Sequence, residues 1–83
     1  MRVSVIVDDN CIYVNHFSER VDLSAMPDFI HAMQWYGTYG EIEFRQDEDG
    51  NRQPNKRLDD FDEFKKYVAA WEVEAQKEIP VAS

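Results

Sequence analysis

Two histidines and one cysteine are the residues of this chain best suited to metal chemistry: His16, His31 and Cys11. A zinc site takes three or four converging ligands, which commonly follow paired spacings such as Cys-x-x-Cys. These three residues show no such spacing, and the pattern around them assigns them to different elements. We therefore predict two ordinary histidines, a structural thiol, no metal site and no cofactor.

Carboxylates for acid–base catalysis are plentiful, but none is marked as buried or as one of an opposed pair. Glu41 and Glu43 share one face of a predicted strand, opposite Ile42 and Phe44, as on a solvated face. Acid–base catalysis needs a pocket that shifts a pKa, and the sequence marks none. A Gly-rich phosphate loop and an activated nucleophile are also missing. We predict no catalytic residue and no enzymatic activity.

Large aromatic residues gather around a pair of glycines in the middle of the chain. Strand alternation places Trp35 and Tyr36 on opposite faces, and Tyr39 falls in a turn. One of the first two can fill a small core, but at least one large aromatic is then exposed, as interface anchors typically are. The predicted partner-binding residues are Trp35, Tyr36, Tyr39, Glu41 and Glu43.

Seventeen acidic residues against nine basic ones give a formal charge of −8. This charge repels nucleic acid and anionic membranes, so we expect neither as a direct partner. The acidity has two remaining interpretations: solubility, or complementarity to a basic protein surface. Residues 41–57 hold five acids and four bases, which makes that region nearly neutral, whereas residues 58–83 hold seven acids and three bases.

The composition indicates one small folded domain spanning residues 1–83. The chain is 43% hydrophobic and 13% aromatic, more than disordered chains contain. No apolar run approaches the ~20 residues of a transmembrane helix. Because Cys11 is the only cysteine, a reducing compartment such as the cytoplasm is expected.

The first 23 residues predict a β-hairpin. Val3 and Val5 alternate with polar or outward positions, the Asx-rich segment 8–10 provides a turn, and residues 11–15 form a second apolar run. Residues 16–19 are predicted to be a polar connection.

Residues 24–45 allow two interpretations. Helical spacing of apolar residues predicts one helix over 24–37. The alternative is a helical turn over 24–30 followed by a second hairpin, with strands at 31–36 and 41–45. We favour the hairpin, because residues 41–44 alternate strictly and aromatic residues before the turn prefer strands.

A loop is predicted over residues 46–58, with room for a short returning strand. Residues 59–79 predict an amphipathic helix, because Phe64, Val68 and Trp71 fall on one stripe, Asp60 can cap its start and Pro80 can close it. The fold class is therefore α+β: a small antiparallel sheet of two or more hairpins, with a C-terminal amphipathic helix packed on one face.

Three segments carry a resemblance to a known group of proteins: VSVIVDDNCIYVN, VDLS and IHAMQWYGTYGEIEF. Together they resemble small uncharacterised proteins encoded in the tail-gene cluster of tailed phages and prophages. The resemblance covers most of residues 3–71. It implies a phage setting close to tail assembly, and it assigns no catalytic or ligand residue.

We therefore expect a non-enzymatic phage or prophage protein that binds a tail or tail-fibre component, as an assembly accessory or a minor structural part. The alternative is a phage-encoded acidic inhibitor of a host protein, such as an anti-CRISPR or other anti-defence factor. Either function places the protein in the host cytoplasm, and the first also allows incorporation into the virion. The partner is a protein in both, and the oligomeric state is left open.

Overall fold

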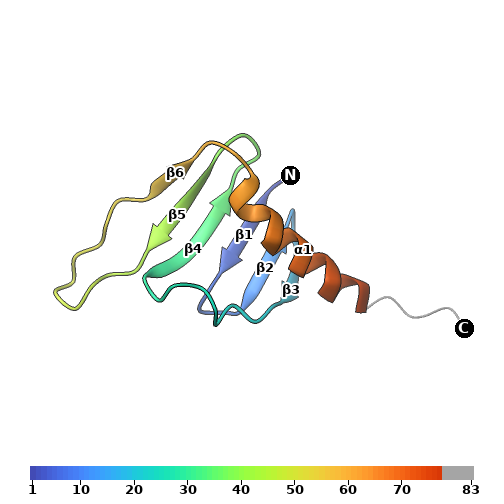
Figure 1. Cartoon of the computed structure of the whole chain (residues 1–83), viewed down its shortest axis with the longest axis horizontal. Coiled ribbons are helices and arrows are strands. Elements are labelled where there is room, and N and C mark those ends of the chain that lie inside the picture. The colour runs from blue at the N-terminus through green and yellow to red at the C-terminus, as the bar shows by residue number, and fades with distance from the viewer. Residues whose placement is uncertain (78–83) are drawn as a thin grey trace, which may run out of the picture.

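A six-stranded antiparallel sheet with one helix packed against it makes up the fold (Figure 1). It is seen in a computed structural model, which describes residues 1–77. The strand order is β3-β2-β1-β4-β5-β6, which confirms the predicted α+β class. The elements are β1 (Val3–Ile6), β2 (Cys11–Val14), β3 (Phe17–Arg20), β4 (Ile30–Trp35), β5 (Gly40–Phe44), β6 (Lys56–Leu58) and α1 (Asp62–Lys77).

The first strand in the sequence lies in the middle of the sheet. β1 pairs with β2, the next strand along the chain, and also with β4, which the chain reaches after leaving β3. Asn10 fixes this path: its backbone carbonyl accepts the N–H of Val21 at 2.9 Å, and its side-chain oxygen accepts the N–H of Leu23 at 3.0 Å. Asn10 has a φ of 46°, a left-handed conformation that asparagine tolerates better than most residues.

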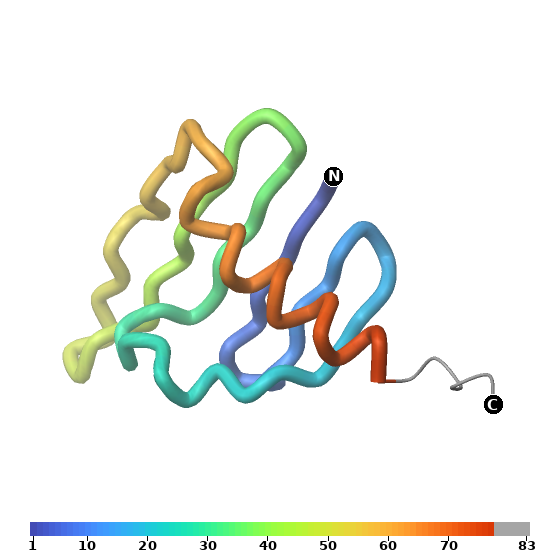
Figure 2. Tube along the Cα trace, turned by 45° about the vertical axis from the view of Figure 1, so that its right-hand side comes forward, coloured from blue at the N-terminus to red at the C-terminus, as the bar shows by residue number. Residues whose placement is uncertain are grey.

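Alternation along the strands gives the sheet one apolar face. Val3 and Val5 of β1 are completely buried, and their cross-strand partners on β2 and β4 are buried with them. α1 crosses this face over β1, β2 and β3 (Figures 1 and 2). We call it the helix face. Its core consists of Val3, Val5, Ile12, Val14, Leu23, Met26, Ile30, Met33, Trp35, Phe64 and Val68.

The helix docks through the stripe that the sequence predicted. Phe64 is fully buried and Val68 is nearly so, while Trp71 packs at the margin of the core. The indole Nε1 of Trp71 also donates a hydrogen bond to the carbonyl of Phe17 at 2.9 Å, which ties α1 to the edge strand β3.

The structure confirms the second hairpin, but the segments before and after it differ from the prediction. Residues 16–19 are not a polar connection, because the chain turns at 15–16 and then forms β3. Residues 24–29 contain turns and no helix. Within the predicted loop 46–58, Lys56–Leu58 returns along β5 as the edge strand β6.

α1 begins at Asp62, later than the predicted position 59. A side-chain oxygen of Asp60 accepts the N–H of Asp62 at 3.0 Å, so Asp60 does satisfy one of the free N–H groups at the start of the helix. The predicted end at residue 79 and the closing Pro80 lie outside the described residues.

Candidate functional site

The face of the sheet opposite α1 is the candidate site, and we call it the open face. Cross-strand partners share a face, so the strand register defines its side chains. One row runs from Ser18 through Tyr13, Ser4, Gln34 and Glu41 to Arg57. The next row runs from Arg20 through Cys11, Ile6 and Ala32 to Glu43. Ala32 is buried, but the other residues of the two rows do not belong to the hydrophobic core, so folding alone does not require their types.

Two tyrosines stand at the end of the open face, where the chain turns from β4 to β5. The N–H of Tyr36 donates to the carbonyl of Tyr39 at 2.8 Å, and Gly37 has a φ of 110°, which favours glycine. The turn therefore brings the two rings together, with 5.1 Å between their centroids. Tyr36 remains 39% exposed. We call these residues the tyrosine pair.

Two arginines flank the tyrosine pair. The guanidinium carbon of Arg2 lies 5.4 Å from the ring centroid of Tyr36, and that of Arg57 lies 4.3 Å from the centroid of Tyr39. Both are cation–π distances. The series Arg2, Tyr36, Tyr39, Arg57 thus crosses from the centre of the sheet to its β6 edge, with a guanidinium group on each ring.

Two carboxylates lie on the same face beside the tyrosine pair. Glu41 accepts a hydrogen bond from the side-chain amide of Asn55 at 3.2 Å. The side chain of Glu43 makes no hydrogen bond or ion pair with any residue in the range 1–77. Burial raises the pKa of the Tyr36 phenol, and the negative charges of Glu41 and Glu43 raise it further. Tyr36 is therefore a neutral hydroxyl at physiological pH, able to donate or accept a hydrogen bond.

Trp35 is separated from the other predicted partner-binding residues. Its side chain lies on the helix face, is 7% exposed, and packs 5.2 Å from the ring of Phe61 and 5.5 Å from that of Phe64. The structure thus brings together Tyr36, Tyr39, Glu41 and Glu43, and it places Trp35 in the core. Their role in partner binding stays a prediction.

Sequence reasoning missed Arg2 and Arg57 as members of this site. Arg2 precedes the central strand and Arg57 lies in the edge strand β6, far from the tyrosine pair in sequence. Only the sheet order brings both to the same end of the open face. The exposed aromatic Tyr13 was also missed, although the alternation of β2 places it opposite the buried Ile12 and Val14.

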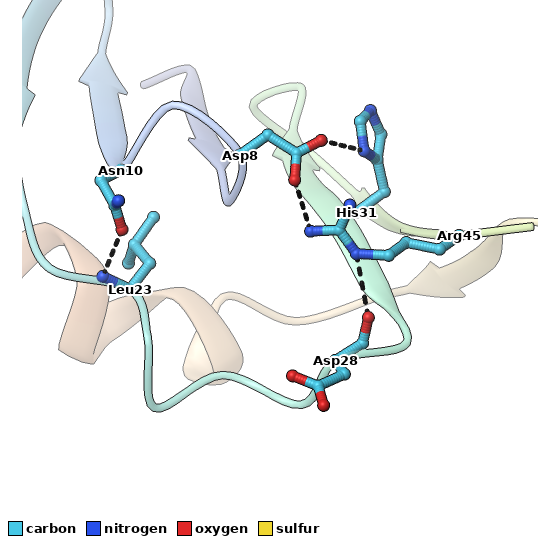
Figure 3. A network of polar contacts seen from close by, with 6 residues as sticks. All are labelled: Asp8, Asn10, Leu23, Asp28, His31 and Arg45. Carbon is cyan, nitrogen blue, oxygen red and sulfur yellow. Dashed lines mark hydrogen bonds and ion pairs between the residues drawn. The ribbon is translucent and has the colours of Figure 1, made fainter.

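A polar cluster joins the two halves of the sheet at the opposite end from the tyrosine pair (Figure 3). One carboxylate oxygen of Asp8 accepts from Arg45 at 2.6 Å, and the other lies 3.4 Å from Nδ1 of His31. Nε of Arg45 also donates to the backbone carbonyl of Asp28 at 2.9 Å. The hydrogen bond from Arg45 lowers the pKa of Asp8, and the nearby charges of Arg45 and His31 act in the same direction. The cluster connects four segments and carries no adjacent nucleophile.

The three residues best suited to metal binding, for which no metal site was predicted, lie apart. Cys11 begins β2, His16 lies in the β2–β3 turn and His31 lies in β4. Among residues 1–77, no group of three or more histidine, cysteine and acidic side chains is placed to hold a metal ion.

A wide groove of about 600 Å³ lies beside the exposed Phe29, whose ring stacks on Phe44 with 6.2 Å between centroids. Two of its polar side chains are already engaged within the chain. Arg45 binds Asp8, and Asp47 accepts the N–H groups of Asp49 and Asn51.

Similarity to known proteins does not assign a role to the open face. No protein-family model matches the sequence, and no curated protein and no solved structure matches it either. In the part of the chain that the structure describes, no helix has the length and apolar character needed to cross a membrane. The open face offers aromatic, acidic and basic groups for noncovalent contact with another macromolecule.

Proposed function

We propose that this protein is a non-enzymatic binding module that contacts a protein partner through the open face around the tyrosine pair. The observation that carries this proposal is the pair itself: two large aromatic rings, held between two arginines and beside two carboxylates, outside the core. Tyrosine and arginine are enriched among the residues that dominate interface energies.

The geometry also supports binding because it is prearranged. A partner that contacts a mobile side chain must overcome the entropy lost when that side chain is immobilised, about 0.5–1.5 kcal/mol each. Here the turn hydrogen bond sets the backbone between the two tyrosines, and the rings already contact each other and the flanking arginines. Binding to a partner therefore costs less side-chain entropy.

A tail or tail-fibre component is the partner we propose, with this protein as an assembly accessory or a minor structural part. The resemblance to small proteins encoded among phage tail genes supports this choice. The formal charge of −8 favours a second candidate, an acidic inhibitor of a host protein that has a basic nucleic-acid channel.

Affinity purification from cells that produce the encoding phage or prophage tests the proposal. The protein is tagged, recovered with its partners, and compared with two variants by mass spectrometry. Tyr39→Ala alters the tyrosine pair. Phe29→Ala removes an aromatic ring that is 60% exposed at a distant position, and it serves as the matched control.

We expect tail proteins to be recovered with the parent and with Phe29→Ala, and to be depleted with Tyr39→Ala. Recovery of a host nuclease in place of tail proteins would favour the inhibitor. Recovery of a partner that is equally retained by both variants would exclude the tyrosine pair as the contact surface.

A further inference from the structure

One row of the open face carries opposite charges at its two ends and no charge between them. Arg20 stands at the β3 end and Glu43 at the β5 end, and neither side chain makes a hydrogen bond or ion pair with another residue of 1–77. Cys11, Ile6 and Ala32 lie between them. Because neighbouring strands are about 4.8 Å apart, the two charged ends are separated by roughly 19 Å. Ile6, on β1, is therefore the midpoint of the row.

This row is complementary to itself in a symmetric dimer. Two copies that pack open face to open face are related by a two-fold axis between the sheets. An axis that runs along β1 places Ile6 opposite Ile6 of the second copy and Cys11 opposite Ala32. It also places Arg20 opposite Glu43. An axis across the strands would place each strand over its own copy and bring like charges together. The charges therefore favour the axis along β1, which forms two Arg20–Glu43 ion pairs between the copies.

The neighbouring row fits the same axis. It places Ser4 opposite Ser4 of the second copy, Tyr13 opposite Gln34, and Ser18 opposite Glu41. The side-chain oxygen of Gln34 accepts a hydrogen bond from the Ser4 hydroxyl at 2.5 Å, and its amide N–H groups make no bond within 1–77. These N–H groups are free to donate to the Tyr13 hydroxyl of the second copy. The arginine of β6 falls beyond the sheet of the second copy, so neither row brings like charges together.

The charged residues at the two ends of β1 do not face their own copies across this axis. The guanidinium of Arg2 lies over the ring of Tyr36, 5.4 Å from its centroid. The carboxylate of Asp8 binds Arg45 and lies beside His31 (Figure 3). Both side chains therefore lean towards β4 and β5, away from the axis, and each charge is met by a group of its own chain.

The open face also lacks the acidic excess of the whole chain. The formal charge of the chain is −8. The two rows and the residues beside the tyrosine pair nevertheless carry three arginines and two glutamates: Arg2, Arg20, Arg57, Glu41 and Glu43. The repulsion between two acidic copies therefore does not originate at this contact.

We propose that the open face binds a second copy of this chain, forming a symmetric dimer whose two-fold axis runs along β1. Its contacts are two ion pairs between Arg20 and Glu43 at the outside and the uncharged residues of the two rows at the centre. Tyr36 lies two positions beyond Gln34 along the chain, so the tyrosine pair stays at the rim of the dimer, where a further protein can reach it. The inference goes beyond the proposed function and does not depend on it.

Sedimentation equilibrium of the full-length protein at concentrations up to about 1 mM tests the dimer. We expect a monomer–dimer equilibrium for the parent. Arg20→Glu alone and Glu43→Arg alone each place like charges in both outer contacts, and each should weaken dimerisation at least about tenfold. The double variant restores both ion pairs with reversed polarity, and it should recover the dissociation constant of the parent within about threefold.

Two charge reversals on α1 serve as matched controls, because the helix lies on the other side of the sheet. Lys66→Glu and Glu72→Arg are at exposed positions and should leave the dissociation constant within about twofold. A parent that stays monomeric at every concentration would overturn the dimer. Single reversals without effect, a double variant as weak as either single one, or equal weakening by the controls would overturn it as well. Recovery in the double variant also excludes misfolding as the cause of the single effects.

Discussion

The two faces of this sheet are built from the same strands, but their residue types have different physical reasons. On the helix face, Val3, Val5 and Ile12 are fully buried, and their types follow from the need to cover an apolar core with α1. On the open face, the same strands present tyrosines, glutamates and arginines, whose types the core does not require. Residues on the helix face should therefore control stability, and those on the open face should control binding.

Trp35 and Tyr36 test this division most directly, because they are neighbours in sequence and lie on opposite faces. Trp35→Ala should lower the free energy of unfolding by about 3–5 kcal/mol, since it leaves a cavity against Phe61 and Phe64. A core of this size rarely supplies more than about 3–5 kcal/mol, so this variant should be largely unfolded. Urea denaturation followed by circular dichroism measures the effect. A midpoint close to that of the parent would show that α1 is not docked through this ring.

Gly40 is the helix-face residue whose substitution should have the next largest effect on stability. A Cβ at this position would lie 2.6 Å from the backbone oxygen of Gln34, 2.9 Å from the Trp35 ring and 3.0 Å from the Phe64 ring. Gly40→Ala should therefore cost about 1–3 kcal/mol, the range for overpacked sites. Thr38→Ala, at an exposed position in the same turn, is the control and should stay within about 0.5 kcal/mol of the parent in thermal melts. Equal stability of the two variants would mean that the backbone relaxes around the new methyl group.

Tyr36→Ala should show the opposite behaviour to Trp35→Ala. We expect a loss of stability of about 1 kcal/mol or less, because the ring is partly exposed, and a loss of partner affinity of about tenfold. Calorimetric titration of the identified partner measures the second quantity. Intact affinity in this folded variant would place the contact elsewhere on the molecule.

Asp8 gives the smallest expected effect, and it depends on pH. Because the hydrogen bond from Arg45 lowers the pKa of Asp8 below its usual 3.8, the folded state favours the ionised carboxylate. This contribution to stability is present above pH 3.8 and is lost as the pH falls through the folded-state pKa. Asp8→Asn should therefore be slightly less stable than the parent at neutral pH, and the two stabilities should converge in acid.

Arg45→Gln provides the second arm of the Asp8 experiment. Arg45→Gln should reduce the loss of stability at acid pH in the same way as Asp8→Asn. The double variant should show little further change in that pH range. Parallel pH profiles of the parent and both variants, measured by thermal melts, would show that the ion pair contributes nothing.

The elements that sequence could predict are those with strong periodicity. The alternation of β1, β2 and β5 and the apolar stripe of α1 are properties of local sequence, and each was found in the structure. β3 was missed because the sequence Phe-Ser-Glu-Arg has little apolar content, and its pairing with β2 depends on a two-residue turn at Asn15 and His16.

The candidate site was predictable only in part, because its composition depends on pairing across the sheet. Alternation showed that one of Trp35 and Tyr36 is exposed, but the choice depends on which face receives Phe61 and Phe64. The partners of the charged residues also depend on pairing across the sheet. Arg45 closely follows Glu41 and Glu43 in sequence, yet it binds Asp8 from the other half of the sheet. Arg57 is far from Glu41 in sequence, yet the pairing of β5 with β6 places the two residues opposite each other.

The central position of β1 has a consequence for the order of folding. The sheet consists of two local meanders, β1-β2-β3 and β4-β5-β6, and their only shared boundary is the pairing of β1 with β4. Hairpins within each meander close in about 1–10 μs, whereas the β1–β4 boundary must first close a longer loop. Phe64 and Val68 are synthesised after all six strands, so the apolar face stays uncovered until α1 has emerged from the ribosome. A nascent chain stalled before α1 should therefore bind chaperones through the strands that later form the core.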